Sequence, residues 1–370
     1  MRTNARFYFS GLIALFLLAA CNSEELSKSP ETTQTGKSEL VTLKSGATVE
    51  YKNGKYYWQD DVILSEVQLK QLDLTGDIVQ EPNQDIGDVI PTSPASGYIH
   101  IPANVDTRST ALYPTPYNLW AMVRFTYAKD GTGTTLNSKT RRLIKQALEH
   151  WEAKTNIRFY NATDQPTIDP SYGFAYPYVN FCDGSSNQSY IGRIDGRQDL
   201  TLIPNGCTVG TIIHEIGHAI GLWHEQCRYD RDNYIIVNMN NIKADLRHNF
   251  EKKTTNYYCI GTFDFNSIML YSSFTGFEIN SSIPSMTKND ENKTTFYGQR
   301  SELSDLDKRF PNTFYLPYTA RSDVYRELAD VVYKSDNTVM TPSERLQLQA
   351  ELNNGNPNPP FGGRIPNSFD

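Results

Sequence analysis

The sequence predicts a two-lobed α+β fold in which a mixed sheet precedes a histidine-bearing helix. Alternating strand patterns at residues 121–127 and 157–160 flank a helical pattern at residues 138–154. Residues 214–224 read HEIGHAIGLWH, which fits a second helix. Residues 225–316 are rich in Asn and Tyr and irregular in pattern, so they predict a second lobe with little regular structure.

The elements of the first lobe follow in order along the chain. Within residues 138–154 the apolar side chains recur at helical spacing: Leu143, Ile144, Ala147, Leu148 and Trp151. Two further strands are expected at residues 189–194 and 199–203. The helix that follows has a buried face made of Ile212, Ile213, Ile216, Ala219 and Ile220.

The HEIGHAIGLWH segment predicts a catalytic metal site. His214 and His218 are four residues apart, so they lie on one face of a helix and can share a metal. Glu215, beside the first ligand, can reach a water molecule. Gly221 can take the left-handed conformation that ends the helix, which lets His224 return as a third ligand. Three neutral ligands and a water form an open coordination shell, as in a catalytic metal site. The alternative is a purely structural His pair on an apolar helix, which would not require Glu215, Gly221 and His224 as well.

A longer set of motifs resembles the astacin family of zinc endopeptidases. Residues 214–232 read HEIGHAIGLWHEQCRYDRD, and SIMLY at 267–271 is similar to the family's Met-turn, with Leu270 where His is usual. Shorter matches are residues 119–120, 189–193, 205–207, 298–300 and 303–304. The resemblance covers residues 111–316 and implies an astacin-like (metzincin) catalytic domain.

The resemblance also implies roles for individual residues. One Zn²⁺ is held by His214, His218 and His224, and Glu215 is the general base. Tyr271 ligates zinc at rest and then binds the oxyanion; its alternative role is that of a packed core tyrosine. The remaining implied roles are structural: Met269 forms a floor beneath the metal, and Glu225 contacts the mature N-terminus, which is expected near Ala111.

The N-terminus predicts export. Residues 1–20 form a signal peptide, with Arg2 and Arg6 before an apolar run at 7–20 that is too short to span a bilayer. Leu-Ala-Ala-Cys at 18–21 resembles a bacterial lipobox, which implies lipidation of Cys21; an ordinary secretory signal is the alternative. We therefore expect an outer-membrane or cell-surface lipoprotein, or one released after propeptide cleavage.

The four remaining cysteines form an even set in an oxidising compartment, and three pairings are open. The resemblance implies a Cys182–Cys207 disulfide, which leaves Cys227 and Cys259 to pair. Cys21 has a competing role as a thiolate ligand of the metal.

Residues 21–110 are expected to form a tether and an inhibitory propeptide. Alternation between residues 40 and 63, with Asn53-Gly54 between two runs, predicts a hairpin. The sequence LTGDI at 74–78 resembles the astacin propeptide motif Phe-x-Gly-Asp. That resemblance makes Asp77 the zinc ligand of the zymogen; the alternative is ordinary turn chemistry.

The resemblance places substrate along an edge strand, here expected within residues 198–203. Arg300 matches the position of an arginine that faces the pocket after the cut, so we expect cleavage before Asp and, less strongly, Glu. The alternative is a surface arginine paired with Glu302 or Asp305.

Residues 317–370 lie beyond the resemblance. Thr341 to Glu344 is a capping box that opens a helix through Leu352, and residues 353–370 are expected to be disordered.

Composition and charge limit the partners. The net charge is −7 and no basic stripe is present, so nucleic acid is not an expected partner. We expect protein or peptide substrates and a monomeric state. We also expect contact with a membrane through the lipid at Cys21. Two other classes stay open: an adhesin or pseudoenzyme on a protease fold, against which the intact Glu215 argues, and a zinc amidase acting on cell wall.

Overall fold

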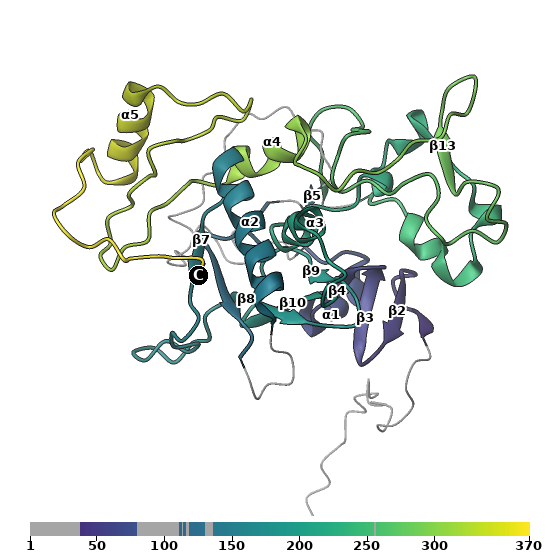
Figure 1. Cartoon of the computed structure of the whole chain (residues 1–370), viewed down its shortest axis with the longest axis horizontal. Helices are drawn as coiled ribbons and strands as arrows, with labels where there is room; N and C mark the ends of the chain where they lie inside the picture. Colours follow the sequence, from purple (N-terminus) through teal and green to yellow (C-terminus); the bar gives the residue numbers. More distant parts are fainter. Residues whose placement is uncertain (1–37, 80–110, 113, 116–117, 130–135, 255–256) are drawn as a thin grey trace, which may run out of the picture. The chain divides into compact units, whose positions relative to one another are not determined.

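The computed structural model describes residues 38–79, 111–112, 114–115, 118–129, 136–254 and 257–370 (Figure 1). The predicted signal peptide, the predicted lipobox with Cys21, and residues 80–110 of the predicted propeptide lie outside these ranges.

The N-terminal part folds as four antiparallel strands and a helix. These are β1 (Glu39–Thr42), β2 (Thr48–Lys52), β3 (Lys55–Gln59), β4 (Val62–Leu64) and α1 (Glu66–Thr75). Asn53 and Gly54 both have positive φ, 52° and 77°, as a two-residue hairpin turn requires, so the predicted hairpin is confirmed. A capping box between Ser65 and Gln68 begins α1.

Strand β4 joins this N-terminal sheet to the following domain. It pairs in parallel with β9 (Ser189–Tyr190), through Val62 with Ser189 and Ile63 with Tyr190. The result is a five-stranded mixed sheet of order β1-β2-β3-β4-β9.

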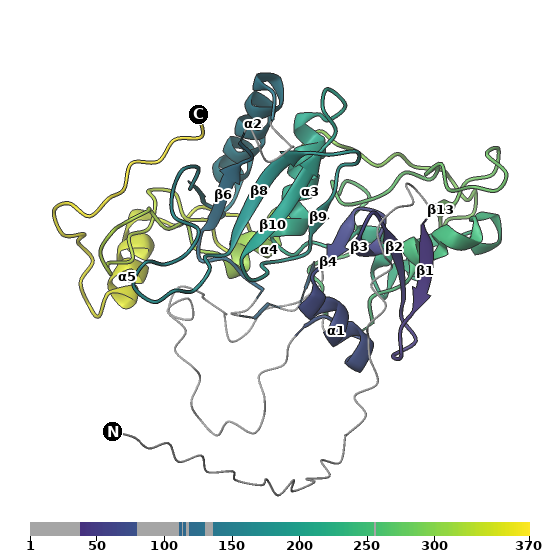
Figure 2. The ribbon, with the colours of Figure 1, turned by 90° about the horizontal axis from the view of Figure 1, so that it is seen from below.

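A second, parallel sheet has the order β10-β8-β6-β7. Its strands are β6 (Val123–Tyr127), β7 (Phe159–Asn161), β8 (Tyr178–Asp183) and β10 (Arg197–Leu202). Helices α2 (Ser138–Lys154) and α3 (Val209–Ala219) pack beside each other against it (Figure 2). The fully buried Trp151 of α2 donates its Nε1 hydrogen to the Ile213 carbonyl oxygen of α3 at 3.2 Å.

The second lobe has little regular structure, as predicted. Two antiparallel pairs connect distant segments: β11 (Ile235–Val237) with β13 (Met286–Lys288), and β5 (Ala111–Leu112) with β12 (Tyr257–Tyr258). Helix α4 (Asp305–Phe314), which the sequence patterns did not reveal, begins at a capping box between Ser304 and Asp307.

The C-terminal extension contains the predicted capped helix, α5 (Pro342–Leu352). The tail differs from the disorder expected for residues 353–370. The Phe369 ring lies 5.9 Å from the Phe125 ring, and Asn367 Nδ2 donates to the Phe159 carbonyl oxygen at 2.7 Å. The tail therefore packs against the edge of the parallel sheet, and one apolar anchor near its end offsets the polar composition that predicted disorder.

A bilayer-spanning helix is absent from the described ranges, where every helix is too short or too polar.

Candidate metal centre

Helix α3 carries two of the three histidines into the interior. Thr208 caps it by accepting a hydrogen bond from the Thr211 backbone nitrogen. His214 and His218 are 2% and 0% exposed, so the polar residues of this helix are buried together with its apolar ones.

Gly221 reverses the chain after α3, as the sequence predicts. Its φ of +111° is a conformation that side chains other than glycine rarely adopt. The Leu222 nitrogen then donates back to the Gly217 carbonyl oxygen, and His224 returns to the two helical histidines. The His224 ring lies 4.7 Å from the His218 ring.

The three imidazoles are oriented through their Nδ1 atoms. These atoms lie 2.8 Å from the Ile268 carbonyl oxygen, 2.8 Å from the Leu222 carbonyl oxygen and 2.9 Å from Gln59 Oε1, for His214, His218 and His224 respectively. An oxygen of these kinds can only accept, so each Nδ1 carries the hydrogen and each Nε2 presents a lone pair.

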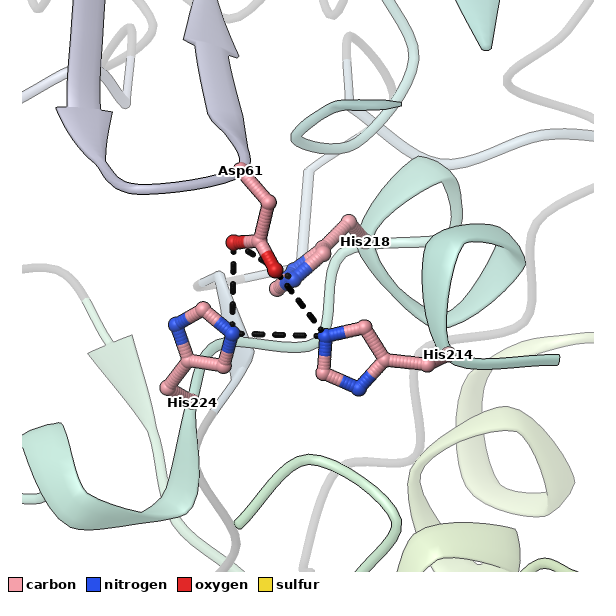
Figure 3. A group of neighbouring side chains, drawn as sticks. All are labelled: Asp61, His214, His218 and His224. Carbon is pink, nitrogen blue, oxygen red and sulfur yellow. Dashed lines mark hydrogen bonds and ion pairs between the residues drawn. The ribbon is translucent and has the colours of Figure 1, made fainter. Parts of the chain in front are cut away.

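A fourth side chain, Asp61, closes the cluster (Figure 3). It lies in the turn between β3 and β4. Its Oδ1 is 3.3 Å from His224 Nε2 and 3.5 Å from His218 Nε2, and its Oδ2 is 3.3 Å from His214 Nε2.

The arrangement fits Zn²⁺. The Nε2 atoms of His214 and His224 are 3.3 Å apart and both face inward as acceptors, so they cannot hydrogen-bond to each other. Tetrahedral zinc with ligands at ~2.0–2.1 Å separates neighbouring ligands by about 3.3–3.4 Å. Burial lowers the pKa of His224 to about 4, which keeps this ligand neutral at physiological pH.

Glu215 is buried beside the cluster, 2% exposed, and its Oε2 has no hydrogen-bond partner among the described residues. Burial, followed by the nearby Asp61 carboxylate, raises its pKa well above the ordinary value. A buried acid with an unused oxygen next to the ligands suits a proton carrier for a reacting water.

The structure places Tyr271 beside His224 and Met269 against α3. The Tyr271 ring is 4.5 Å from the His224 ring, and its hydroxyl has no hydrogen-bond partner in the described ranges. Met269 packs beneath α3, since a methyl group on Gly217 would come within 2.8 Å of the Met269 sulfur.

Arg300 also lies near the cluster. Its Nη1 donates to the Leu270 carbonyl oxygen at 3.1 Å, and burial lowers the pKa of its guanidinium. The acids considered as its surface partners are bound elsewhere: Glu302 pairs with Lys154 at 2.8 Å, and Asp305 pairs with Lys308 at 2.7 Å.

Glu225 is close in sequence to Leu222, the residue with which Ala111 pairs. Glu225 Oε1 accepts the Asp264 backbone hydrogen at 2.9 Å, and burial raises the pKa of Glu225 to about 8. Ala111 is fully buried and forms a bridge with Leu222, three residues before Glu225.

The carboxylate at the histidines is Asp61, which corrects the prediction of Asp77. Gly76, with φ +79°, is the C-cap of α1, and Asp77 Oδ1 accepts the Val79 backbone hydrogen at 2.9 Å. The LTGD segment therefore serves as a helix C-terminus and turn, the alternative that the sequence left open.

The predicted substrate strand, residues 198–203, falls largely on β10. Strand β10 pairs with β8 on one side, and its Thr201 forms a bridge with Gln188 on the other. Strand β4 pairs with β9 instead. Both segments precede α3.

Neither predicted disulfide is formed in the structure, where Cys182, Cys207 and Cys227 are thiols. The Cys227 sulfur accepts from Gln59 Nε2 at 2.7 Å and donates to the Asn249 carbonyl oxygen at 3.3 Å. Its polar neighbours are therefore groups other than a second sulfur.

Two further residues of the site, Asp61 and Gln59, were missed by sequence reasoning. Gln59 is fully buried and links His224 to Cys227. The available signal was the pair of adjacent acids Asp60 and Asp61, which follows the aromatic run at 56–58 after Gln59.

Comparisons with known proteins agree with the site. Over 177 residues the chain is 40% identical to Blastula protease 10 of Paracentrotus lividus, covering 47% of this chain and 29% of that protein. It is 37% identical over 179 residues to Flavastacin of Elizabethkingia meningoseptica, covering 48% of this chain and 37% of that protein. It is 41% identical over 136 residues to Astacin-like metalloprotease toxin 5 of Loxosceles gaucho, covering 36% of this chain and 67% of that protein.

Among the solved structures that match this chain is high choriolytic enzyme 1, a hatching enzyme zinc-protease of Oryzias latipes. The TM-score is 0.44 at 28% identity, over 52% of this chain and 88% of that chain. The chain spans about a third of the length of the first curated relatives it matches, between 28% and 37%. The sequence model of the peptidase family described as Astacin matches residues 113–316, more than half of the chain, so this chain belongs to the astacin family.

Proposed function

We propose that the chain is a zinc endopeptidase that hydrolyses peptide bonds in proteins and is made as a zymogen. The observation that carries the proposal is the convergence of three Nε2 lone pairs, fixed through their Nδ1 hydrogens, beside the unsatisfied Glu215 Oε2.

The residues of the chain have separate tasks in the proposed reaction. His214, His218 and His224 hold the zinc, which, when bound, polarises the scissile carbonyl and acidifies water. Glu215 Oε2 takes a proton from the attacking water and gives it to the leaving amine. Tyr271 supplies a hydroxyl for the oxyanion.

Latency is assigned to the β3–β4 hairpin. Its Asp61 occupies the position opposite the histidines, and the Asp61 carbonyl oxygen accepts the Ser189 backbone hydrogen at 2.9 Å. Strand β4 covers β9, so the same hairpin blocks both the metal and the strand along which a peptide would bind. Cleavage near Ala111 would free this segment.

The proposal also covers the location of the protein and the residue that it prefers after the cut. The basic and apolar residues before Cys21 support export and attachment through a lipid at Cys21, and nothing in the site requires a second subunit. The buried cation of Arg300 beside the cluster supports a preference for Asp, and less strongly Glu, after the cut.

The test is hydrolysis by the processed protein. Casein should be cleaved, a chelator should stop the cleavage, and Zn²⁺ should restore it. Cleavage of peptidoglycan in place of casein would favour a cell-wall amidase. Binding to proteins without cleavage would favour an adhesin.

A further inference from the structure

The β3–β4 hairpin packs its side chains against the catalytic domain beside the proposed metal site. Val62, Leu64 and Trp58 face the same side and pack in one cluster with Leu112, Ile191 and Trp223 of the catalytic domain. Tyr57 faces the other side, where its hydroxyl donates to Gln188 at 2.9 Å.

Trp58 fills a slot with two specific walls. Its ring meets the Trp223 ring edge to face at 5.3 Å. The Lys253 ammonium lies 3.2 Å from the Trp58 ring centre and 4.4 Å from the Trp223 ring centre. The indole therefore sits between an aromatic ring and a cation, each of which is attracted to it.

Lys253 is unusual for a buried lysine. It is 5% exposed, and among the described residues no carboxylate lies within ion-pair distance of its ammonium. Burial lowers the pKa of Lys253 to about 8. Two indole rings lie against its ammonium, Cys227, Glu251 and Asp77 favour its charged form, and release of the hairpin removes one of the rings.

We propose that the slot between Trp223 and Lys253 is a substrate subsite that takes an aromatic side chain. The inference rests on the proposed peptidase function and deepens it. A peptide that replaces β4 along β9 directs alternate side chains into the cluster that Val62 and Leu64 share with Trp58 and Trp223. Trp58, on β3, leaves with the same hairpin, so a large aromatic side chain that extends from the β4 position to Trp223 and Lys253 restores the ring contact and the cation–π contact that Trp58 makes in the zymogen.

The subsite is tested on the processed enzyme with sets of quenched peptides. Each set varies a single position, which carries Trp, Leu or Glu, and the sets together cover positions on both sides of the cut. Wild type should prefer Trp over Leu at one position. Lys253→Met should lower that ratio roughly threefold to thirtyfold, mainly through KM. Lys253→Arg, which keeps a cation over the ring, should preserve it.

Lys252→Met is the matched control, because Lys252 is partly exposed and pairs with Asp232 at 2.7 Å. It should leave the ratio unchanged. Thermal unfolding of each variant checks that it is folded. Equal cleavage of Trp and Leu peptides by wild type, a preference for Glu at that position, or an unchanged ratio in Lys253→Met would overturn the subsite. Cleavage of no peptide by wild type would overturn the peptidase function, and the subsite with it.

Discussion

The Oδ1 atom of Asp61 lies 3.3 Å from Nε2 of His224, while Gln59, two residues earlier, accepts the Nδ1 hydrogen of the same imidazole. One hairpin thus contacts both sides of one proposed zinc ligand. This double contact links latency and metal binding in the predictions that follow.

Asp61→Ala should give the unprocessed chain weak but measurable peptidase activity, because the group opposite the histidines is lost while β4 still pairs with β9. Asp77→Ala is the matched control and should stay latent, since Asp77 belongs to the turn after α1. Peptide hydrolysis by uncleaved protein, verified by mass, is the readout. Activity in the Asp77 variant but not in the Asp61 variant would restore the original sequence prediction.

Gln59→Ala should weaken zinc binding by the unprocessed chain about tenfold to a hundredfold, the usual effect of removing the partner of a ligand histidine. Competition with a chromophoric chelator measures it. The same affinity in both proteins would show that the Gln59 contact does not orient His224.

Arg300→Ala should abolish the preference for Asp after the cut, and Arg300→Lys should keep part of it, because an ammonium cannot form the bidentate pair. Library profiling of the three processed proteins is the measurement. A preference that survives in Arg300→Ala would mean that another group binds the acid.

Lys253 should make stability depend on pH between about 8 and 10.5. Its folded pKa of about 8 is below the ordinary 10.5, so the unfolded chain binds more protons in this window and the free energy of unfolding rises with pH. The rise is at most about 3 kcal/mol. Lys253→Met should flatten it relative to Lys252→Met in urea unfolding of the full chain; identical slopes would contradict the burial argument.

Sequence reasoning predicted the parts of the fold that depend on local pattern. The HEIGHAIGLWH spacing fixes three ligands within a single helix and turn, and Asn53-Gly54 fixes a hairpin. The sequence did not reveal Asp61 as the fourth side chain of the cluster. Asp61 and His214 are 153 residues apart, and strand pairing brings them together. The Gly-Asp pair at 76–77 matched a short motif, yet the same residues also suit a helix C-cap.

Long-range packing explains the remaining differences. The tail looked disordered by composition, but Phe369 finds an apolar site on the parallel sheet. Cysteine number allowed disulfides, whereas the Cys227 sulfur accepts a hydrogen bond from the Gln59 side chain and donates one to the Asn249 backbone carbonyl oxygen.

The most direct test of the central claim is Glu215→Gln in the processed protein, assayed together for zinc and for casein cleavage. The account predicts one zinc per chain, as in wild type, and at least about a 10²-fold loss of rate. Wild-type cleavage by a variant that retains its zinc would contradict the assignment of this site as a zinc peptidase centre.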